Sequence, residues 1–352
     1  MNAPFHVGVT RDARLPGTDR PMADMGLELL DAAGARWRFL AEDPGYSEEV
    51  RPELIADCDG LFVIGSRFTG RSFAGAPAER LVCLARWGVG YDRIDVPACT
   101  AAGVALTITP EGTRRPVAVT QLGLILALAL KLPLKDRLAR EGRAAEKIYH
   151  FGIGLTGRTL GSLGIGNIGS ELFRITAPLD MRRIAADPYA APAAAEALGV
   201  ELVPIERLLR ESDFLCINTP LNDETRGIIG AAALARMKPT SYLINTARGE
   251  IVETAALTAA LQGGRLAGAG LDVTDPEPLP ADHPLCKLEN VILAPHALAW
   301  TDEIALGNGR SACQSLLACA RGEAPVPPQL VNRDVLDNPA FRRKLERWRK
   351  AS

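Results

Sequence analysis

Three polar side chains, each just after an apolar run in the second half of the chain, have the types needed for acid-base chemistry on a small acid. They are Arg248 in NTARGE, Glu277 in DVTDPEP and His296 in APHALAW. An imidazole, with an unperturbed pKa of about 6.5, can take or give a hydroxyl proton near neutral pH. A carboxylate on its other ring nitrogen would fix the tautomer, and an arginine can bind a carboxylate through two hydrogen bonds. Each residue alone could equally be structural, so the prediction rests on the three together.

A glycine-rich turn has the pattern of a dinucleotide-binding loop. The string GIGNIG places Gly164, Gly166 and Gly169 as G-x-G-x-x-G between an apolar run and a stretch that can open a helix. These glycines would allow a tight turn, close approach of a pyrophosphate, and close packing of the helix on the strand. Asp187, at the end of the next apolar run, can accept both ribose hydroxyls and would repel a 2′-phosphate. The pattern predicts NAD as the cofactor; the alternative is an ordinary glycine-rich turn with a surface aspartate.

Together these two sets of residues predict an oxidoreductase. Oxidation of a 2-hydroxy acid needs a base for the hydroxyl proton, a cation for the carboxylate and carbonyl oxygens, and a hydride acceptor. His296, Arg248 and NAD would provide these three, because the carboxyl ends of parallel strands face one ligand crevice. We therefore expect an NAD-dependent enzyme that acts on the CH–OH group of 2-hydroxy acids. It would transfer a hydride between the nicotinamide and C2 of a small 2-hydroxy or 2-keto acid.

The elements that must position these residues form two series of alternating strands and helices. A long helix is predicted from Pro116 to Leu132 between the two series, and another from Gly307 to Arg321 after the second. Such alternation predicts two doubly wound parallel sheets of the α/β class. The strand candidates are HVGV near residue 6, LFVIG at 61–65, LVCLA at 81–85, VALTI at 104–108, TLGSLGIG at 159–166, RRIAAD at 182–187, FLCINTP at 214–220, YLINTA at 242–247, LAGAGLDV at 266–273 and VILAPH at 291–296.

The order of the two series predicts a discontinuous arrangement of domains. A chain of 352 residues is long enough for two domains. We expect a Rossmann NAD-binding domain at residues 114–303. It would be inserted in a flavodoxin-like substrate-binding, or catalytic, domain made of residues 1–113 and 304–352.

The composition argues against several other classes of partner. The 40 basic and 42 acidic side chains leave a formal charge of -2, which provides no long-range field for nucleic acid or an anionic membrane. The most apolar run, LGLILALAL at 122–130, is too short to span a bilayer, and the first residues do not resemble a secretory signal. We therefore expect a cytoplasmic protein whose partner is a small molecule. The 7 cysteines form no C-x-x-C pair, which favours reduced thiols in the core and no metal site.

Seven blocks in the same order resemble the D-isomer-specific 2-hydroxyacid dehydrogenases over nearly the whole chain. The ending PHALAWT is especially similar to the branch that includes phosphoglycerate dehydrogenases, here expected without an appended regulatory domain. The blocks are ARWGVGYDRIDV at 85–96, GSLGIGNIG at 161–169, DPY at 187–189, NTPLNDETRGII at 218–229, LINTARGEIV at 243–252, GLDVTDPEP at 270–278 and APHALAWTDE at 294–303.

The resemblance implies roles at the matching positions. It makes Arg248 the substrate-binding arginine, Glu277 the partner of the histidine, and His296 the acid-base catalyst. It also implies that Asp272 holds the nicotinamide carboxamide. The full set of cofactor-binding residues that we expect is Gly164, Gly166, Asn167, Ile168, Gly169, Asp187, Pro188, Thr219, Pro220, Thr225 and Asp272.

Three further positions are expected to contact the substrate. The turn that contains Val89 and Gly90 resembles the family loop whose backbone N–H groups bind the substrate carboxylate. Arg248 would bind the same acid. Trp300 lies four residues beyond His296 and is expected to cover the substrate, although it could equally anchor the return helix by packing.

One departure from the family pattern leaves the substrate open. Many members have an asparagine and then V-A-E-H before the interdomain helix, whereas this chain has Arg114, Arg115 and then VAVTQ at 117–121. With Arg67 and Arg71 in SRFTGRS, these arginines are expected beside the cleft and favour a substrate with a polar or anionic tail. The alternative is that all four are ordinary solvated charges.

Two alternative functions are compatible with the same residues. A glyoxylate or hydroxypyruvate reductase would run the reaction toward the hydroxy acid in the cell. Some relatives of this fold are instead non-catalytic NAD-sensing scaffolds. The resemblance also implies a homodimer formed through the cofactor domains.

Overall fold

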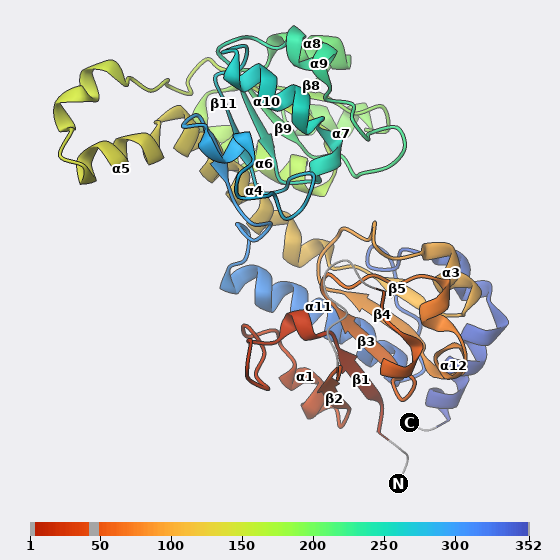
Figure 1. Ribbon diagram of the computed structural model, residues 1–352. Coiled ribbons are helices and arrows are strands. Elements are labelled where there is room, and N and C mark those ends of the chain that lie inside the picture. Colours follow the sequence, from red (N-terminus) through yellow and green to blue (C-terminus); the bar gives the residue numbers. More distant parts are fainter. Residues whose placement is uncertain (1–3, 42–48, 351–352) are drawn as a thin grey trace. The chain divides into compact units, whose positions relative to one another are not determined.

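The computed structural model describes residues 4–41 and 49–350, which form two compact units (Figure 1). Unit 1 comprises Met1–Thr113 and Thr301–Ser352, and unit 2 comprises Arg114–Trp300. The chain passes from unit 1 to unit 2 inside helix α4 (Pro110–Ala129) and returns just before helix α11 (Asp302–Ala320). Unit 2 is therefore inserted in unit 1.

Unit 1 is built on a parallel sheet with the strand order β2-β1-β3-β4-β5. This is the flavodoxin-like order, as predicted. The side chains of β3 are buried along its whole length, as expected for a sheet covered on both faces. The described elements, in addition to α11, are β1 (His6–Val9), β2 (Arg36–Phe39), β3 (Gly60–Val63), β4 (Cys83–Arg86), β5 (Ala105–Thr107), α1 (Glu28–Ala32), α2 (Ala76–Arg80), α3 (Val96–Ala101) and α12 (Pro339–Arg349).

Unit 2 is built on a second parallel sheet, in the order β12-β11-β10-β9-β6-β7-β8. Counted from its first strand, this is the Rossmann order with one more strand at the end, so the prediction of two doubly wound α/β sheets is confirmed. Its strands are β6 (Thr159–Leu163), β7 (Arg182–Ala186), β8 (Glu201–Leu202), β9 (Phe214–Ile217), β10 (Tyr242–Asn245), β11 (Gly268–Leu271) and β12 (Val291–Leu293). Its helices, after α4, are α5 (Leu132–Arg140), α6 (Asn167–Thr176), α7 (Pro192–Ala197), α8 (Ile205–Glu211), α9 (Ala231–Arg236) and α10 (Thr254–Gln262).

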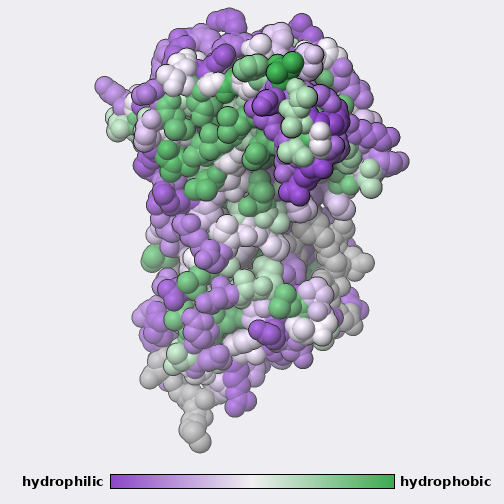
Figure 2. Space-filling view, turned by 90° about the vertical axis from the view of Figure 1, so that its left-hand side faces the viewer, coloured by the Kyte–Doolittle hydropathy of each residue, from purple (hydrophilic) through white to green (hydrophobic). Residues whose placement is uncertain are grey.

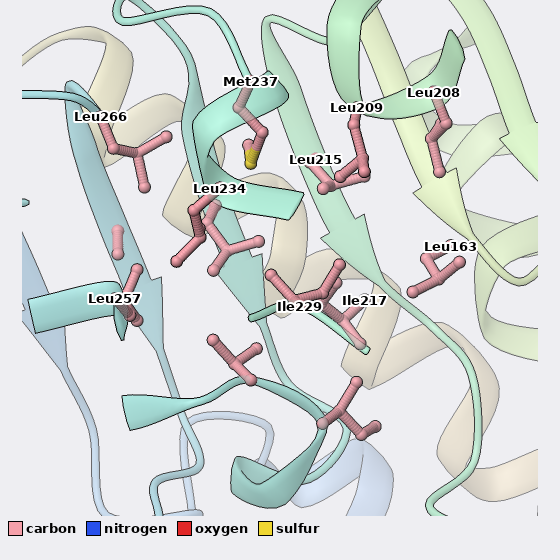
Figure 3. Close-up of a cluster of buried hydrophobic side chains, with 14 of the residues drawn as sticks. Leu163, Leu208, Leu209, Leu215, Ile217, Ile229, Leu234, Met237, Leu257 and Leu266 are labelled. Carbon is pink, nitrogen blue, oxygen red and sulfur yellow. The ribbon is translucent and has the colours of Figure 1, made fainter. Parts of the chain in front are cut away.

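Side chains that alternate along the strands of unit 2 fill two separate cores. Leu215 and Ile217 of β9 join the cluster under α8, α9 and α10, which Figure 3 shows with Leu234 and Leu257. The residue between them, Cys216, joins the opposite cluster, to which α4 and α6 contribute. Because both faces of the sheet are covered, its strands consist largely of apolar residues, and polar residues concentrate at the strand ends.

Two strands of the structure lie outside the predicted set. Strand β2, with the sequence RWRF, alternates exposed arginines with half-buried aromatic residues at the edge of its sheet. Strand β8 has only two residues and also lies at an edge. Neither strand carries the apolar run on which the prediction depended.

The predicted bounds of two helices are wrong. Helix α4 begins at Pro110, not at Pro116, because a proline fits the first turn of a helix, where an N–H would have no partner. It ends at Ala129, shortly before Lys131 adopts the left-handed conformation with φ 53°. Helix α11 begins at Asp302, not at Gly307, since the Thr301 hydroxyl caps it by accepting from the N–H of Ile304.

The cysteines and the apolar helices bear on two predictions made from the composition. Six of the cysteines are buried, as predicted, whereas Cys286 is exposed and does not lie in the core; all seven are free thiols. Among the described residues, no single helix is long and apolar enough to cross a membrane. Helices α4 and α5 reach that length and hydropathy only when taken together across a bend of 57°.

Candidate active site

Three neighbouring strands of unit 2 each lead into one of the predicted catalytic residues. Strands β10, β11 and β12 are adjacent and parallel, so their carboxyl ends lie along the same edge of the sheet. Arg248 follows β10, Glu277 follows β11, and His296 follows β12. The topology thus brings residues from three distant parts of the sequence to one edge, where ligands of such sheets bind.

Glu277 and His296 are in direct contact. Nδ1 of His296 lies 2.7 Å from Oε1 of Glu277, and each side chain is about one-third or less exposed. With the Nδ1 proton donated to the carboxylate, the imidazole presents Nε2 as the atom that can exchange a proton with a ligand.

The backbone of His296 adopts a left-handed conformation, with φ 56°. Such a conformation is unfavourable for a residue with a Cβ, and here Asp272 holds it. The N–H of His296 donates to the carbonyl oxygen of Asp272 at 2.7 Å, and the N–H groups of Ala297 and Leu298 both donate to its Oδ1. Asp272 is 5% exposed, and this burial raises the pKa of its carboxyl group, which the two N–H donors partly offset. The residue predicted to hold the carboxamide therefore also fixes the histidine turn.

Arg248 lies in a turn that a buried asparagine organises. The side chain of Asn245 donates to the carbonyl oxygen of Arg248 at 2.8 Å and accepts from the N–H of Ala247 at 3.0 Å. The next residue, Gly249, packs against the loop that leads to Glu277, since a Cβ on it would lie 2.1 Å from the backbone of Thr274. The structure thus places Arg248 on a loop that touches the Glu277 loop. Sequence reasoning did not single out Asn245, although its place at a strand end was a signal.

The glycine-rich turn between β6 and α6 has the close contacts that the motif requires. Gly164 has φ +94°, and a Cβ on it would lie 2.7 Å from the carbonyl oxygen of Asn218. A Cβ on Gly169 would lie 2.7 Å from the carbonyl oxygen of Gly164. Both positions therefore exclude any larger side chain, as the predicted roles in turning and in helix packing demand.

The middle glycine and the start of helix α6 fit a pyrophosphate. Gly166 is the N-cap of α6, and a Cβ on it would meet no heavy atom within 4 Å. No side chain caps this helix, so the N–H groups of its first turn, which includes Asn167 and Ile168, are available to an anion. Open space beside Gly166 together with an uncapped N-terminus is the arrangement that a dinucleotide needs.

Asp187 directly follows β7 and forms a hydrogen bond with the glycine-rich turn. Its Oδ2 accepts from the N–H of Ile165 and its Oδ1 from the N–H of Tyr189, both at 2.9 Å. Beyond Pro188, the exposed Tyr189 donates its hydroxyl to Glu224 at 3.1 Å. A second carboxylate, which sequence reasoning missed, therefore contacts Tyr189, two residues beyond the residue expected to bind the ribose.

The predicted contacts after β9 lie on a tightly bonded turn. A Cβ on Gly164 would lie 3.0 Å from the backbone nitrogen of Thr219, so this residue borders the glycine-rich turn. The hydroxyl of Thr225 donates to the carbonyl oxygen of Pro220 at 2.6 Å and accepts from the N–H of Asn222. Thr225 thus stabilises the turn, and its contact with a diphosphate stays a prediction.

Comparison with known proteins decides the family. The profile described as "D-isomer specific 2-hydroxyacid dehydrogenase, NAD binding domain" matches residues 122–297. A glyoxylate reductase of Korarchaeum cryptofilum is 40% identical over 294 residues, which cover 82% of this chain and 87% of that protein. The chain belongs to the D-isomer-specific 2-hydroxyacid dehydrogenase family.

Two further similar proteins support the same family. A D-3-phosphoglycerate dehydrogenase of Archaeoglobus fulgidus is 38% identical over 70% of this chain and 46% of its own length. The crystal structure of the TT0316 protein from Thermus thermophilus has a TM-score of 0.78 and 30% identity, and covers 93% of this chain and 100% of that chain. The predicted family, the NAD cofactor and the class of NAD-dependent D-2-hydroxyacid dehydrogenase are confirmed.

Two of the arginines expected beside the cleft of this dehydrogenase pair with a buried carboxylate, and any role of theirs toward a substrate stays a prediction. Arg115 pairs with Glu171 at 2.9 Å, and Arg114 lies 3.8 Å from the same side chain. Arg174 is a third partner at 3.0 Å. Burial opposes ionisation of Glu171, but hydrogen bonds from Arg174 and Arg115 lower its pKa. These contacts give Arg115 a structural role in unit 2.

The other residues expected near the substrate lie partly in unit 1 and partly in unit 2. In unit 1, Arg71 pairs with Glu49 at 3.1 Å, and the side chain of Arg67 is exposed. The turn with Val89 and Gly90 is held by Arg86, whose Nε donates to the carbonyl oxygen of Gly90 at 2.9 Å. In unit 2, Trp300 is 49% exposed at the end of a turn. The roles of these residues toward a substrate stay predictions.

Proposed function

We propose that this dehydrogenase reduces a small polar 2-keto acid to the D-2-hydroxy acid with His296 as the acid. The observation that carries the proposal is the 2.7 Å contact between His296 Nδ1 and Glu277 Oε1 at the carboxyl edge of the sheet. A histidine held in this way has one protonatable nitrogen directed to its ligand and a carboxylate that stabilises its charged form.

The chain's own residues divide the work of the reaction. NAD, when bound, supplies or accepts the hydride at its nicotinamide ring. His296 donates its Nε2 proton to the carbonyl oxygen during reduction and takes the hydroxyl proton during oxidation. Glu277 keeps the Nδ1 proton in place, and Arg248 binds the substrate carboxylate through its guanidinium group. The glycine-rich turn and Asp187 are proposed to hold the pyrophosphate and the ribose of the cofactor.

Reduction of glyoxylate or hydroxypyruvate is the favoured reaction. Several relatives named glyoxylate reductase are 37–42% identical to this chain. Such substrates have a carboxylate for Arg248 and little or no tail, so they do not require the arginines that pair with Glu171 and Glu49.

An NADH oxidation assay over a panel of 2-keto acids tests the proposal. Glyoxylate, hydroxypyruvate and 2-ketoisocaproate should be compared at equal concentration, with the chirality of any chiral product determined. Highest kcat/KM on glyoxylate or hydroxypyruvate is expected. Activity confined to the branched aliphatic acid contradicts the proposed substrate class, and bound NADH without turnover of any acid contradicts the proposed function.

We also propose that the chain forms a homodimer through unit 2. Large apolar side chains are exposed along α4, α5 and the following segment, with Tyr149 76% and Phe151 80% exposed. Figure 2 shows apolar side chains gathered on the corresponding face of unit 2. Ion pairs on α5 and after it, such as Asp136 with Arg140, supply both signs of charge beside the patch, as a self-complementary surface requires. The exposed apolar residues here are Val119, Leu126, Leu130, Leu132, Ile148, Tyr149 and Phe151.

Light scattering after size exclusion tests the dimer. Phe151→Asp combined with Leu132→Asp should give the mass of one chain, whereas the wild type should give twice that mass. Val326→Asp, at a position in unit 1 that is 66% exposed, is the matched control and should leave the mass unchanged. A wild type with the mass of one chain contradicts the proposal.

A cytoplasmic location is proposed on the state of the cysteines. Seven free thiols, six of them buried, fit a reducing compartment. Fractionation of cells that produce the protein should place it with cytoplasmic markers.

A further inference from the structure

A buried glutamine in helix α4 contacts the edge of the sheet where the predicted catalytic residues lie. Gln121 is 0% exposed and belongs to the segment VAVTQ, where the chain departs from the family pattern. Its Nε2 donates to Oδ1 of Asn218 and to Oγ1 of Thr246, both at 2.7 Å. These two partners follow strands β9 and β10, at the edge where the catalytic residues gather.

One branch of this arrangement leads to the cofactor turn. Nδ2 of Asn218 donates to the hydroxyl of Ser162 at 2.9 Å, and that hydroxyl donates to the carbonyl oxygen of Gly164 at 2.5 Å. Gly164 is the first glycine of the dinucleotide motif. A continuous chain of hydrogen bonds therefore runs from Gln121 to the turn that would hold the pyrophosphate.

The other branch leads to the turn of the substrate-binding arginine. Thr246 directly follows Asn245, whose side chain holds the carbonyl oxygen of Arg248, and precedes Arg248 by two residues. A shift of Thr246 would move this turn. The glutamine is thus linked through Asn218 to the cofactor turn and through Thr246 to the arginine turn.

The side-chain oxygen of Gln121 indicates that this residue does more than fill space in the core. Its Oε1 is buried and has no hydrogen-bond partner among the residues that the structure describes. A buried polar atom without a partner destabilises the folded state, and an apolar side chain of the same size would avoid this. The two bonds made by Nε2 are the feature that such an apolar side chain could not reproduce.

We propose that Gln121 is a positioning residue that sets the cofactor turn and the Arg248 turn relative to each other. The inference rests on the proposed function for the role of Arg248. Gln121 contacts neither ligand itself, and it acts through Asn218 and Thr246. Loss of its amide therefore affects binding of both ligands, whereas loss of one partner affects only one.

The test compares three variants by two independent measurements. Gln121→Met removes both bonds at nearly constant volume, Ser162→Ala removes the cofactor branch, and Thr246→Val removes the arginine branch. The first measurement is the Kd of NADH from fluorescence titration without substrate, and the second is the KM of the 2-keto acid at saturating NADH. Thr176→Val is the matched control, because it deletes another fully buried hydroxyl of unit 2 that bonds only within helix α6.

Gln121→Met is expected to raise both the Kd and the KM by about fivefold, the loss of roughly one buried hydrogen bond on each branch. Ser162→Ala should raise only the Kd, Thr246→Val only the KM, and the control neither. Unchanged Kd and KM in Gln121→Met, with only a lower Tm, overturn the inference. If Gln121→Met does not fold, equal effects of the two branch variants on Kd and KM overturn it.

Failure of the proposed function gives a different result. In that case the wild type binds NADH but turns over no 2-keto acid, and only the KM measurement is lost. The NADH titrations of Gln121→Met and Ser162→Ala then still decide whether the glutamine positions the cofactor turn.

Discussion

Oε1 of Glu277 lies 2.7 Å from Nδ1 of His296, across 19 positions of sequence. The contact exists because β11 and β12 are adjacent and parallel, so their carboxyl ends lead both residues to the same place. It gives the histidine one tautomer and stabilises its charged form, which is what an acid-base catalyst needs.

Removal of either partner of this pair should slow the chemical step. His296→Ala is expected to lower kcat by about 100-fold to 10,000-fold, since it removes the proton donor. Glu277→Gln should lower kcat by about tenfold or more, because the amide no longer stabilises the imidazolium. Steady-state kinetics measure both effects. The Kd of NADH, from fluorescence titration, should stay nearly constant in both variants.

A matched control separates this effect from a general loss of negative charge. Glu211→Gln removes a carboxylate of unit 2 that pairs with Arg207 on the surface, and it should leave kcat unchanged. If His296→Ala keeps the wild-type kcat, the histidine has no part in proton transfer.

Much of the site could be predicted from the sequence because its residues follow strands. Arg248, Glu277 and His296 each follow the end of a strand by three to six residues, and parallel strands bring such positions to one edge. The glycines of the cofactor turn have a fixed spacing for a local reason, the geometry of one strand, one turn and one helix. In these cases the sequence around each residue contains the information that positions it.

The parts that escaped prediction depend on contacts between distant segments. Gln121 is separated from Asn218 by 97 positions and from Thr246 by 125, and a glutamine in an apolar helix does not indicate its partners. The same holds for Arg115, whose bond to Glu171 joins residues 56 positions apart in the sequence. Strand β2 escaped because its arginines are exposed at a sheet edge and interrupt any apolar run.

The buried carboxyl group of Asp272 should destabilise the protein above its pKa. Burial raises this pKa above the usual value for an aspartate, so the native state binds the proton more tightly than the unfolded state. Stability from this group is therefore greatest at low pH and is lost as the pH rises through the folded-state pKa. Asp272→Asn keeps an oxygen for the N–H groups of Ala297 and Leu298 but removes the charge.

Asp272→Asn is thus expected to raise the Tm at pH 7, by about 2 °C or more. The difference from the wild type should shrink as the pH falls toward the usual pKa of an aspartate, because the wild-type carboxyl group becomes neutral. Thermal unfolding followed by circular dichroism at several pH values measures this. If the Tm of Asp272→Asn is below that of the wild type at pH 7, and this gap closes toward low pH, the charge stabilises the folded state.

Only one of the cysteines should react quickly in the native protein. Burial raises the pKa of Cys58, Cys99 and Cys313 to about 12, so their reactive thiolate forms are scarce near neutral pH. Cys286 alone is exposed. Titration with an aromatic disulfide reagent should therefore release one equivalent rapidly, and the 7 expected for the whole chain only after unfolding. Cys286→Ser should abolish the rapid phase; a persistent rapid phase would mean that a buried thiol becomes exposed in solution.

Two glycines of the cofactor turn should respond to the same substitution in opposite ways. A Cβ on Gly166 meets open space, and its φ of −62° suits any residue, so Gly166→Ala should fold with a Tm close to that of the wild type. Its methyl group would occupy the space proposed for the pyrophosphate, and the Kd of NADH should rise at least about tenfold, because a close backbone approach is lost.

Gly169→Ala instead places a methyl 2.7 Å from the carbonyl oxygen of Gly164. Forcing α6 away from the strand should destabilise the fold by about 1–3 kcal/mol. Denaturant unfolding and NADH titration of both variants measure the contrast, and a Gly166→Ala variant that binds NADH as the wild type does would remove this turn from the cofactor site.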